Sequence, residues 1–198
     1  MQKIVLASSS PYRADLLKKL GLPFTQASPN IDETAFDNEA PTELVTRLAK
    51  SKAIILAEHN PDSLIIGSDQ VAVIGDRILG KPGDTEKAFE QLSIASGNKV
   101  TFITGITLYN SRTQSIQHSV EFYNVYFREL TAEQISFYIE KEQPFDCAGS
   151  FKSEGFGVSL FKRMEGDDPN TLIGLPLIKL IELLNLENID VLQPNKPI

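Results

Sequence analysis

The sequence has a single cysteine, Cys147, and only two histidines, His59 and His118, among 198 residues. One cysteine excludes an intrachain disulfide framework and a cysteine-based zinc site. Two histidines are too few for a histidine metal cluster. The residue counts alone allow a Ser-His-Asp arrangement, but no nucleophile-elbow sequence supports one. We interpret these three side chains as structural or incidental.

Basic residues and long apolar runs are also scarce. The 19 Lys+Arg against 26 Asp+Glu give a net charge of −7, which disfavours binding to nucleic acid polymers or anionic membranes. No apolar run approaches the roughly 18 residues of a membrane span, and the apolar stretch at residues 3–7 is too short for a signal peptide. We therefore expect a cytoplasmic protein. A small anionic ligand is compatible with this balance, because it needs only a few local cations.

The composition is that of a globular protein, with 41% hydrophobic and 23% charged residues, and predicts one domain over residues 1–198 with a loosely structured tail after about residue 190. Strand and helix patterns intermix along the chain. Two long strands joined by a short turn near residues 110–114 argue against a purely parallel sheet, so we predict an α/β class with a mixed sheet. Strands are expected at 3–7, 24–27, 64–67, 71–74, 77–79, 100–108, 115–128 and 160–164, and helices at 11–20, 41–57, 84–97, 131–142 and 170–186.

Two glycine motifs do not fit known nucleotide loops. The run from Gly75 to Lys81 matches the first seven places of a P-loop, but Pro82 stands where the magnesium-binding Ser or Thr belongs. The same run has the pattern of a hairpin with a turn at Gly75-Asp76. Gly155-Phe-Gly157 lacks the third glycine of a dinucleotide fingerprint. We reject both motifs.

The segment Ser8-Ser9-Ser10-Pro11-Tyr12-Arg13 joins a predicted buried strand to a helix start. Free N–H groups and the helix dipole at such a start hold phosphate, and an arginine one turn further can bind its oxygens in a fork. Plain helix capping with a solvated arginine explains the same residues.

Lys52 and Asp69 are the next candidates. Lys52 interrupts the apolar stripe of the helix over 41–57, so its amine either extends along the helix to water, which is the commoner case, or points into a cleft. Asp69 follows a predicted strand, where a carboxylate can hold a metal, activate water or simply start a turn.

Glu33 lies in an acidic loop and Lys81 precedes Pro82 at the hairpin end, and each is a surface charge in the simplest interpretation. Taken with Arg13, Lys52 and Asp69, they supply two carboxylates, three cations and a helix end suited to an anion. This combination suits metal-assisted attack on a polyphosphate.

The chain resembles the Maf family along nearly its whole length. The matching segments are Ser8–Arg13, Asp32-Glu33-Thr34, Lys52-Ala53, Gly67–Val71, Gly80-Lys81-Pro82, Ser96-Gly97 with Thr104-Gly105, Cys147–Gly155 and Asp168–Pro176. The resemblance implies an ITPase-like α/β fold, with a long twisted mixed sheet flanked by helices and two lobes around a central cleft. It implies a nucleoside triphosphate pyrophosphatase that cuts the α–β phosphate bond with Mg²⁺ or Mn²⁺, and a homodimer.

The resemblance also implies roles for single residues. Asp69 would be the catalytic carboxylate, as proton acceptor or metal ligand, and Glu33 would share the metal. The triphosphate would be held by Ser8, Ser9, Arg13, Lys52 and Lys81. Tyr12, Gln70 and Glu154 match the positions that set base choice.

Within the family the chain resembles the branch that acts on 7-methyl-GTP. Gln70, Cys147 and the run from Gly149 to Glu154 carry that likeness, while Tyr12 stands where the branch usually has tryptophan and keeps an aromatic ring. N7-methylguanine carries a positive charge, which an aromatic face and a carboxylate at Glu154 would both favour. The alternatives are the same reaction on dTTP, UTP or CTP, or a nucleotide-binding regulator of cell division.

Overall fold

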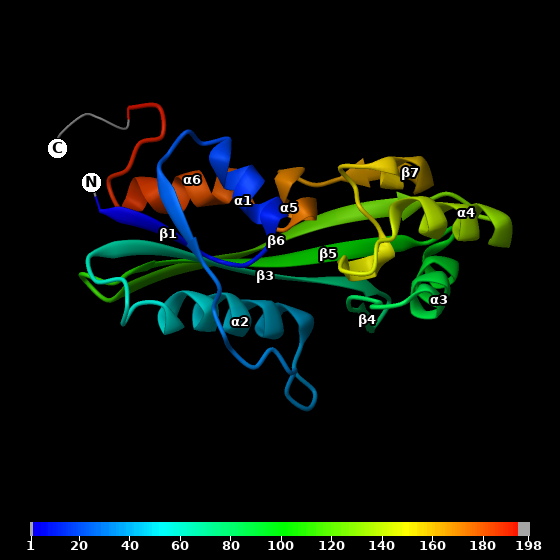
Figure 1. Ribbon diagram of the computed structural model, residues 1–198, viewed down its shortest axis with the longest axis horizontal. Coiled ribbons are helices and arrows are strands. Elements are labelled where there is room, and N and C mark those ends of the chain that lie inside the picture. Colours follow the sequence, from blue (N-terminus) through cyan, green and yellow to red (C-terminus); the bar gives the residue numbers. More distant parts are fainter. Residues whose placement is uncertain (1, 194–198) are drawn as a thin grey trace. The chain divides into compact units, whose positions relative to one another are not determined.

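The computed structural model describes residues 2–193, and its strands form one seven-stranded sheet in the order β2-β1-β3-β5-β6-β7, with β4 paired to β3. The predicted α/β class with a mixed sheet is confirmed, because β1 is parallel to β2 and β3 whereas β4 and β7 pair antiparallel (Figure 1). The strands are β1 Lys3–Ala7, β2 Phe24–Ala27, β3 Ser63–Ile74, β4 Arg77–Leu79, β5 Lys99–Asn110, β6 Ser115–Phe127 and β7 Phe161–Glu165. The helices are α1 Pro11–Lys18, α2 Pro41–Ile55, α3 Thr85–Ala95, α4 Ala132–Glu142, α5 Asn170–Ile173 and α6 Leu177–Leu186, with short 3-10 turns η1 Ala148–Ser150 and η2 Phe156–Leu160.

The described chain divides into two compact units. The first contains residues 2–69, 104–121 and 174–193, and the second contains residues 70–103 and 122–173. The single domain over residues 1–198 stays a prediction. The tail expected after about residue 190 falls in part on residues 194–198, which lie outside the described residues.

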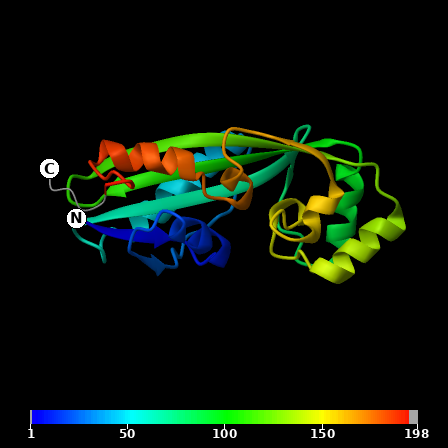
Figure 2. The ribbon, with the colours of Figure 1, turned by 90° about the horizontal axis from the view of Figure 1, so that it is seen from above.

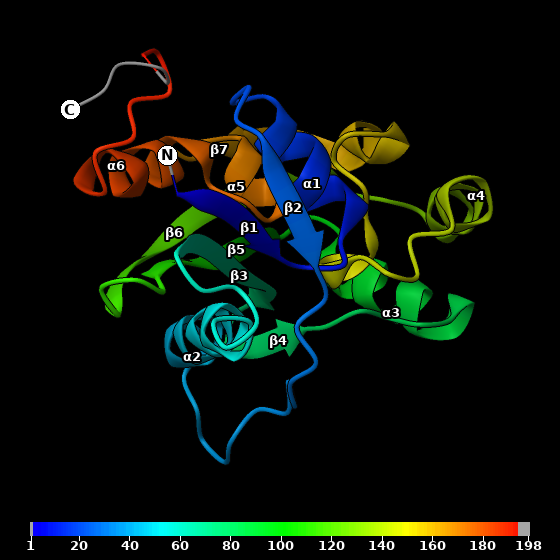
Figure 3. The same ribbon diagram turned by 60° about the vertical axis from the view of Figure 1, so that its left-hand side comes forward.

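In the first unit, α2 covers one face of the strands and α1 and α6 cover the other (Figures 1 and 3). Residues Ile4–Ala7 of β1 are buried, as expected for an inner strand covered on both faces. Gly67 of β3 lies so close to α2 that an added Cβ would be 2.1 Å from the carbonyl oxygen of Ala49. This close approach sets how far α2 stands from β3, and therefore where the side chains between them meet.

The strand that carries Asp69 is longer than predicted. The sequence placed residues 68–70 just beyond a strand that ends at Gly67, but β3 continues to Ile74. Its parallel pairing with β1 does end at Gly67, opposite Ala7, and antiparallel pairing with β4 begins at Ala72. Asp69 therefore lies inside β3, just past the carboxyl end of its neighbour β1.

Helix starts agree with the capping chemistry of the sequence. Ser10 caps α1 and Asp84 caps α3, each through a side chain that accepts a backbone N–H, and Thr131 with Gln134 forms a capping box before α4. The helix predicted over 170–186 is divided into α5 and α6, and Pro176 immediately precedes α6. Helices α1 and α2 each end two residues earlier than predicted. None of the helices within residues 2–193 is long and apolar enough to cross a membrane.

The second unit packs its helices around an aromatic core. Helix α3 contacts α4 and η1, and α4 contacts η2 (Figure 2). The rings of Phe102, Phe127 and Phe161 each meet Phe151 edge to face, with centroids 4.9–5.5 Å apart. The β3–β4 hairpin turns at Gly75, whose φ is +56°, so the hairpin predicted in place of a P-loop is confirmed.

Candidate functional site

Lys52 of α2 joins two carboxylates in the first unit. Its Nζ lies 2.6 Å from Asp69 Oδ1 and 2.8 Å from Glu33 Oε1. The side chains of Lys52 and Asp69 are 6% and 9% exposed, whereas that of Glu33 is 54% exposed. The site is thus a buried ion pair with a second carboxylate on its water side.

The position of Lys52 decides between the two alternatives left by the sequence. A lysine on an apolar helix face most often extends its amine to water, but here the amine stays inside and binds Asp69. The reason is tertiary, since Gly67 brings β3 against α2 and places Asp69 within reach of the lysine. The commoner interpretation, extension to water, is wrong for this residue.

Burial dominates the electrostatics of Asp69. Removal from water raises the pKa of its carboxyl above the usual value, although Lys52 and Arg13 act in the opposite direction. Glu33 raises the pKa of Asp69 further, because it is a second negative charge nearby. Asp69 is therefore a carboxylate of increased basicity, held in place by an ammonium group.

Arg13 belongs to the same group of charges. Burial lowers the pKa of its guanidinium, while Asp69 and Glu33 raise it; it keeps its proton in any case. Its Nε donates to the carbonyl oxygen of Gly174 at 2.9 Å, and Ser68 Oγ donates to the same oxygen at 2.7 Å. Gly174 has φ +106°, which only glycine adopts readily. Gly174 stands in one of the family segments, but sequence reasoning missed its anchoring role.

The turn between β1 and α1 carries the remaining predicted residues of this unit. Ser8 is buried and its Oγ accepts the N–H of Ser10 at 3.1 Å, while Ser9 is exposed and Tyr12 is half-buried. The side chain of Gln26 donates to the carbonyl oxygens of Ser8 and Ser10 at 2.8 and 3.2 Å. The turn is thus fixed from within, and Ser9 faces solvent at its tip.

Arg47 ties the 28–40 loop to α2, and sequence reasoning missed it. Its guanidinium makes a two-pronged contact with Glu39 at 2.6 and 2.7 Å, donates to the carbonyl oxygen of Thr34 at 3.1 Å, and lies 4.0 Å from the ring centre of Phe36. The hydrogen bonds from Arg47 lower the pKa of Glu39 to about 2, so its carboxylate stays ionised well into the acidic range. Because Thr34 follows Glu33 directly, this contact holds the loop that brings Glu33 to Lys52.

Arg47→Ala is expected to speed amide hydrogen exchange at Phe36 by about tenfold or more. The Phe36 N–H donates to Glu39 at 3.0 Å, and Glu39 loses its anchor in the variant. Exchange followed by mass spectrometry or NMR measures the effect. The matched control is Arg77→Ala, which removes an exposed pair with Glu90 and should leave the loop unchanged. Unaltered exchange at Phe36 in Arg47→Ala would contradict the clamping role.

Glu33 and Asp69 are the carboxylates that this site offers to a divalent cation. Within residues 2–193 no group of three or more His, Cys, Asp or Glu is arranged to hold a metal. Mg²⁺ is usually bound by one or two carboxylates together with substrate phosphates. The pair therefore fits a cation that is completed by a polyphosphate, and does not fit a metal enclosed by protein ligands.

Gln70, Lys81 and Glu154 belong to the second unit. Gln70 donates to the carbonyl oxygen of Thr171 at 2.6 Å. Lys81 is exposed next to Gly80, whose carbonyl oxygen accepts from Gln91 at 3.2 Å. Glu154 is exposed and accepts from Ser153 Oγ at 3.2 Å. The structure brings Arg13, Glu33, Lys52 and Asp69 together in the first unit, and places these three in the second.

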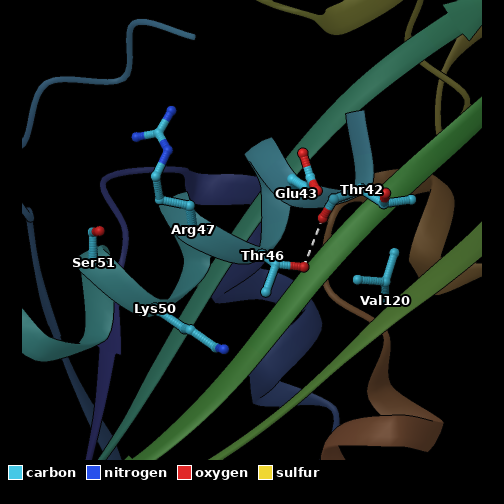
Figure 4. A pocket seen from close by; sticks show the side chains of 7 residues that line it. All are labelled: Thr42, Glu43, Thr46, Arg47, Lys50, Ser51 and Val120. Atoms are coloured by element: carbon cyan, nitrogen blue, oxygen red, sulfur yellow. Dashed lines mark hydrogen bonds between the residues drawn. The ribbon is translucent and has the colours of Figure 1, made fainter. Parts of the chain in front are cut away.

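A groove of about 560 Å³ lies elsewhere on the first unit. It runs between α2 and Val120 of β6, and Arg47 points away from Val120 (Figure 4). None of the predicted site residues lines it; the lining residues are Thr42, Glu43, Thr46, Arg47, Lys50, Ser51 and Val120.

Comparison with known proteins identifies the family. Residues 3–187 match the Maf-like protein family. The chain belongs to the Maf family. A 7-methyl-GTP pyrophosphatase of Aliivibrio fischeri is 53% identical to this Maf protein over 96% of this chain and 98% of its own length. One from Alcanivorax borkumensis is 55% identical over 95% of each chain. Among solved structures, the Staphylococcus aureus Ham1 protein covers 94% of this Maf protein, with a TM-score of 0.47 and 13% identity.

Proposed function

We propose that this protein hydrolyses 7-methyl-GTP to 7-methyl-GMP and pyrophosphate and so removes a modified nucleotide. One observation carries the proposal: relatives at 53–55% identity over nearly the whole chain are named 7-methyl-GTP pyrophosphatase. Arg13, Glu33, Lys52 and Asp69 support it, since a protein that only binds a nucleotide has no need for a buried carboxylate of increased basicity.

In the proposed reaction a water oxygen bonds to the α-phosphorus. The bond from that phosphorus to the α–β bridging oxygen breaks, and the bridging oxygen leaves with its electron pair as part of pyrophosphate. Asp69 accepts a proton from the water, a role that its raised pKa favours. Lys52 holds the Asp69 carboxylate in place through the 2.6 Å contact.

The positive charges would bind the triphosphate. Arg13, Lys52 and Lys81 are proposed to hold its oxygens and stabilise the charge that develops on the leaving pyrophosphate, with Ser8 and Ser9 at the phosphate turn. Glu33 would hold a divalent cation, and Asp69 would be its second ligand in the alternative role of that carboxylate. When bound, Mg²⁺ or Mn²⁺ would neutralise phosphate oxygens and orient them.

Base choice is assigned to Tyr12, Gln70 and Glu154. An aromatic ring attracts the cationic N7-methylguanine by about 0.5–2 kcal/mol. The Glu154 carboxylate would accept from the guanine N1–H and amino group and offset the positive charge. The exposure of Glu154 leaves its oxygens accessible to a ligand.

Two further parts of the proposal are a homodimer and a cytoplasmic location. The first comes from family resemblance. The second is supported by the names of the relatives, which are nucleotide pyrophosphatases. Analytical ultracentrifugation and cell fractionation test them.

A nucleotide panel with Mg²⁺ and Mn²⁺ titration tests the function. Purified protein is incubated with 7-methyl-GTP, GTP, dTTP, UTP and CTP, and released pyrophosphate is measured with inorganic pyrophosphatase and malachite green. The highest kcat/KM is expected for 7-methyl-GTP. A higher kcat/KM for dTTP, UTP or CTP would show that the reaction is as proposed but that the substrate is a different nucleotide. Absence of pyrophosphate release from every nucleotide would favour a regulator of cell division.

Glu154→Gln is expected to lower kcat/KM for 7-methyl-GTP by about ten- to a hundredfold relative to UTP, because hydrogen bonds to a charged group are lost. The neutral amide cannot offset the charge of the methylated base. Steady-state kinetics on both substrates measure the ratio. Equal losses on the two substrates would contradict the role of Glu154 in base choice.

A further inference from the structure

The turn that carries Glu154 lies against the C-terminal end of α4. We call residues 152–156 the Glu154 turn; it links η1 to η2 within the second unit. Figures 1 and 2 show this segment beside α4, and η2 packs on the helix. Glu154 is exposed near the middle of the turn. Its position therefore depends on how the two ends of the turn are held.

Lys152 fixes the first end through four hydrogen bonds. Its N–H donates to the hydroxyl oxygen of Tyr138 at 3.0 Å, and its Nζ donates to the carbonyl oxygen of Glu142 at 3.0 Å. Its own carbonyl oxygen accepts the N–H groups of Gly155 and Gly157 at 3.3 and 3.1 Å. Backbone and side chain of Lys152 are thus both held, and α4 supplies two of the contacts.

Phe156 fixes the second end. Its N–H donates to Glu142 Oε1 at 3.2 Å. Its ring stacks on Tyr138, with centroids 6.4 Å apart and planes 18° from parallel, and Lys141 Nζ lies 3.7 Å from the ring centre. Gly155 lies so close to Glu142 that an added Cβ would be 2.9 Å from Oε2. Tyr138 and Glu142 therefore contact both ends of the turn.

We infer that Tyr138 and Glu142 are positioning residues that hold Glu154 where it selects the base. The inference rests on the proposed function of Glu154. Tyr138 is almost fully buried in the core of the second unit, so its hydroxyl is a fixed point for the turn. Neither residue is placed among the groups that bind phosphate or transfer a proton. Loosening the turn should therefore reduce discrimination between bases more than it reduces turnover.

Glu142→Ala and Tyr138→Phe test the inference. Each is expected to lower the ratio of kcat/KM for 7-methyl-GTP over UTP by about tenfold, because a displaced carboxylate loses its hydrogen bonds to the base. Glu142→Gln keeps an acceptor for the Phe156 N–H and should restore most of the ratio. Glu142 is only half-buried, so its variants remain informative even if Tyr138→Phe weakens the core. Glu90→Ala and Tyr126→Phe, which remove a surface ion pair and a surface hydrogen bond, are the matched controls.

The same variants combined with Glu154→Gln distinguish a failure of the positioning inference from a failure of the proposed function of Glu154. If the helix acts through Glu154, then Glu142→Ala should lower the ratio no further once Glu154 is glutamine. An unchanged ratio in Glu154→Gln alone would contradict the proposed function of Glu154. Suppose instead that Glu154→Gln lowers the ratio while Glu142→Ala and Tyr138→Phe keep the wild-type ratio. This result would overturn the positioning inference and leave the proposed function of Glu154 intact. Equal losses on both nucleotides in Glu142→Ala would also overturn it.

Discussion

Replacing Asp69 by asparagine is expected to lower kcat by about a thousandfold or more, because the proton acceptor of the proposed reaction is lost. Asparagine has nearly the same shape and can still accept from Lys52 through its amide oxygen. The fold should therefore survive, as circular dichroism and the unfolding midpoint would show. Pyrophosphate release at saturating nucleotide and metal measures the loss in kcat.

The control for this experiment is Asp15→Asn. Asp15 lies on α1 in the same unit, but its carboxylate is exposed and binds only the neighbouring Lys18 among the described residues. That variant should keep wild-type turnover. Turnover close to wild type in Asp69→Asn would remove Asp69 from the catalytic group and leave its ion pair with Lys52 as a structural contact.

Lys52→Met is expected to destabilise the protein by about 3–5 kcal/mol in addition to abolishing activity. The side chains of Lys52 and Asp69 are both nearly buried, so removal of the ammonium leaves a buried carboxylate without its partner. The second carboxylate, Glu33, then repels Asp69 across the same space. Urea denaturation followed by circular dichroism measures the change in the free energy of unfolding.

A double variant shows whether the loss comes from the stranded charge. Lys52→Met with Asp69→Asn removes both buried ions and should regain about half or more of the lost stability, although activity stays absent. Lys50→Met serves as the control, since it makes the same substitution two residues earlier on α2. Equal stability of Lys52→Met and the wild type would show that the pair contributes nothing to folding.

The sequence predicted the elements of this fold well wherever the signal is local. The helices beginning near residues 11, 84 and 131 were predicted, and at each start the side chain of Ser10, Asp84 or Thr131 satisfies an N–H group three residues away. The hairpin at Gly75 was predicted for a similar reason, since the turn requires a residue that tolerates positive φ. Contacts over so few residues follow from the order of the amino acids.

The sequence was less informative about where β3 ends. Ser68, Asp69 and Gln70 are polar, and polar residues after an apolar run usually mark the end of a strand. Here Ser68 binds the carbonyl oxygen of Gly174 and Asp69 binds Lys52, so both side chains are satisfied without leaving the strand. The partner of Ser68 is 106 residues away along the chain and that of Asp69 is 17 residues away, and no local pattern indicates either.

By itself the sequence determined the α/β class, the residues that carry charge and, through its family segments, the reaction expected of them. Only the tertiary structure decided that Lys52 stays buried between Asp69 and Glu33, that Arg47 holds the loop of Glu33, and that the end of α4 holds the turn of Glu154. The physical reason is distance along the chain. Caps and turns are settled by neighbours within a few residues, whereas a lysine becomes a buried ion partner only when a strand and a helix pack closely enough to exclude water from it.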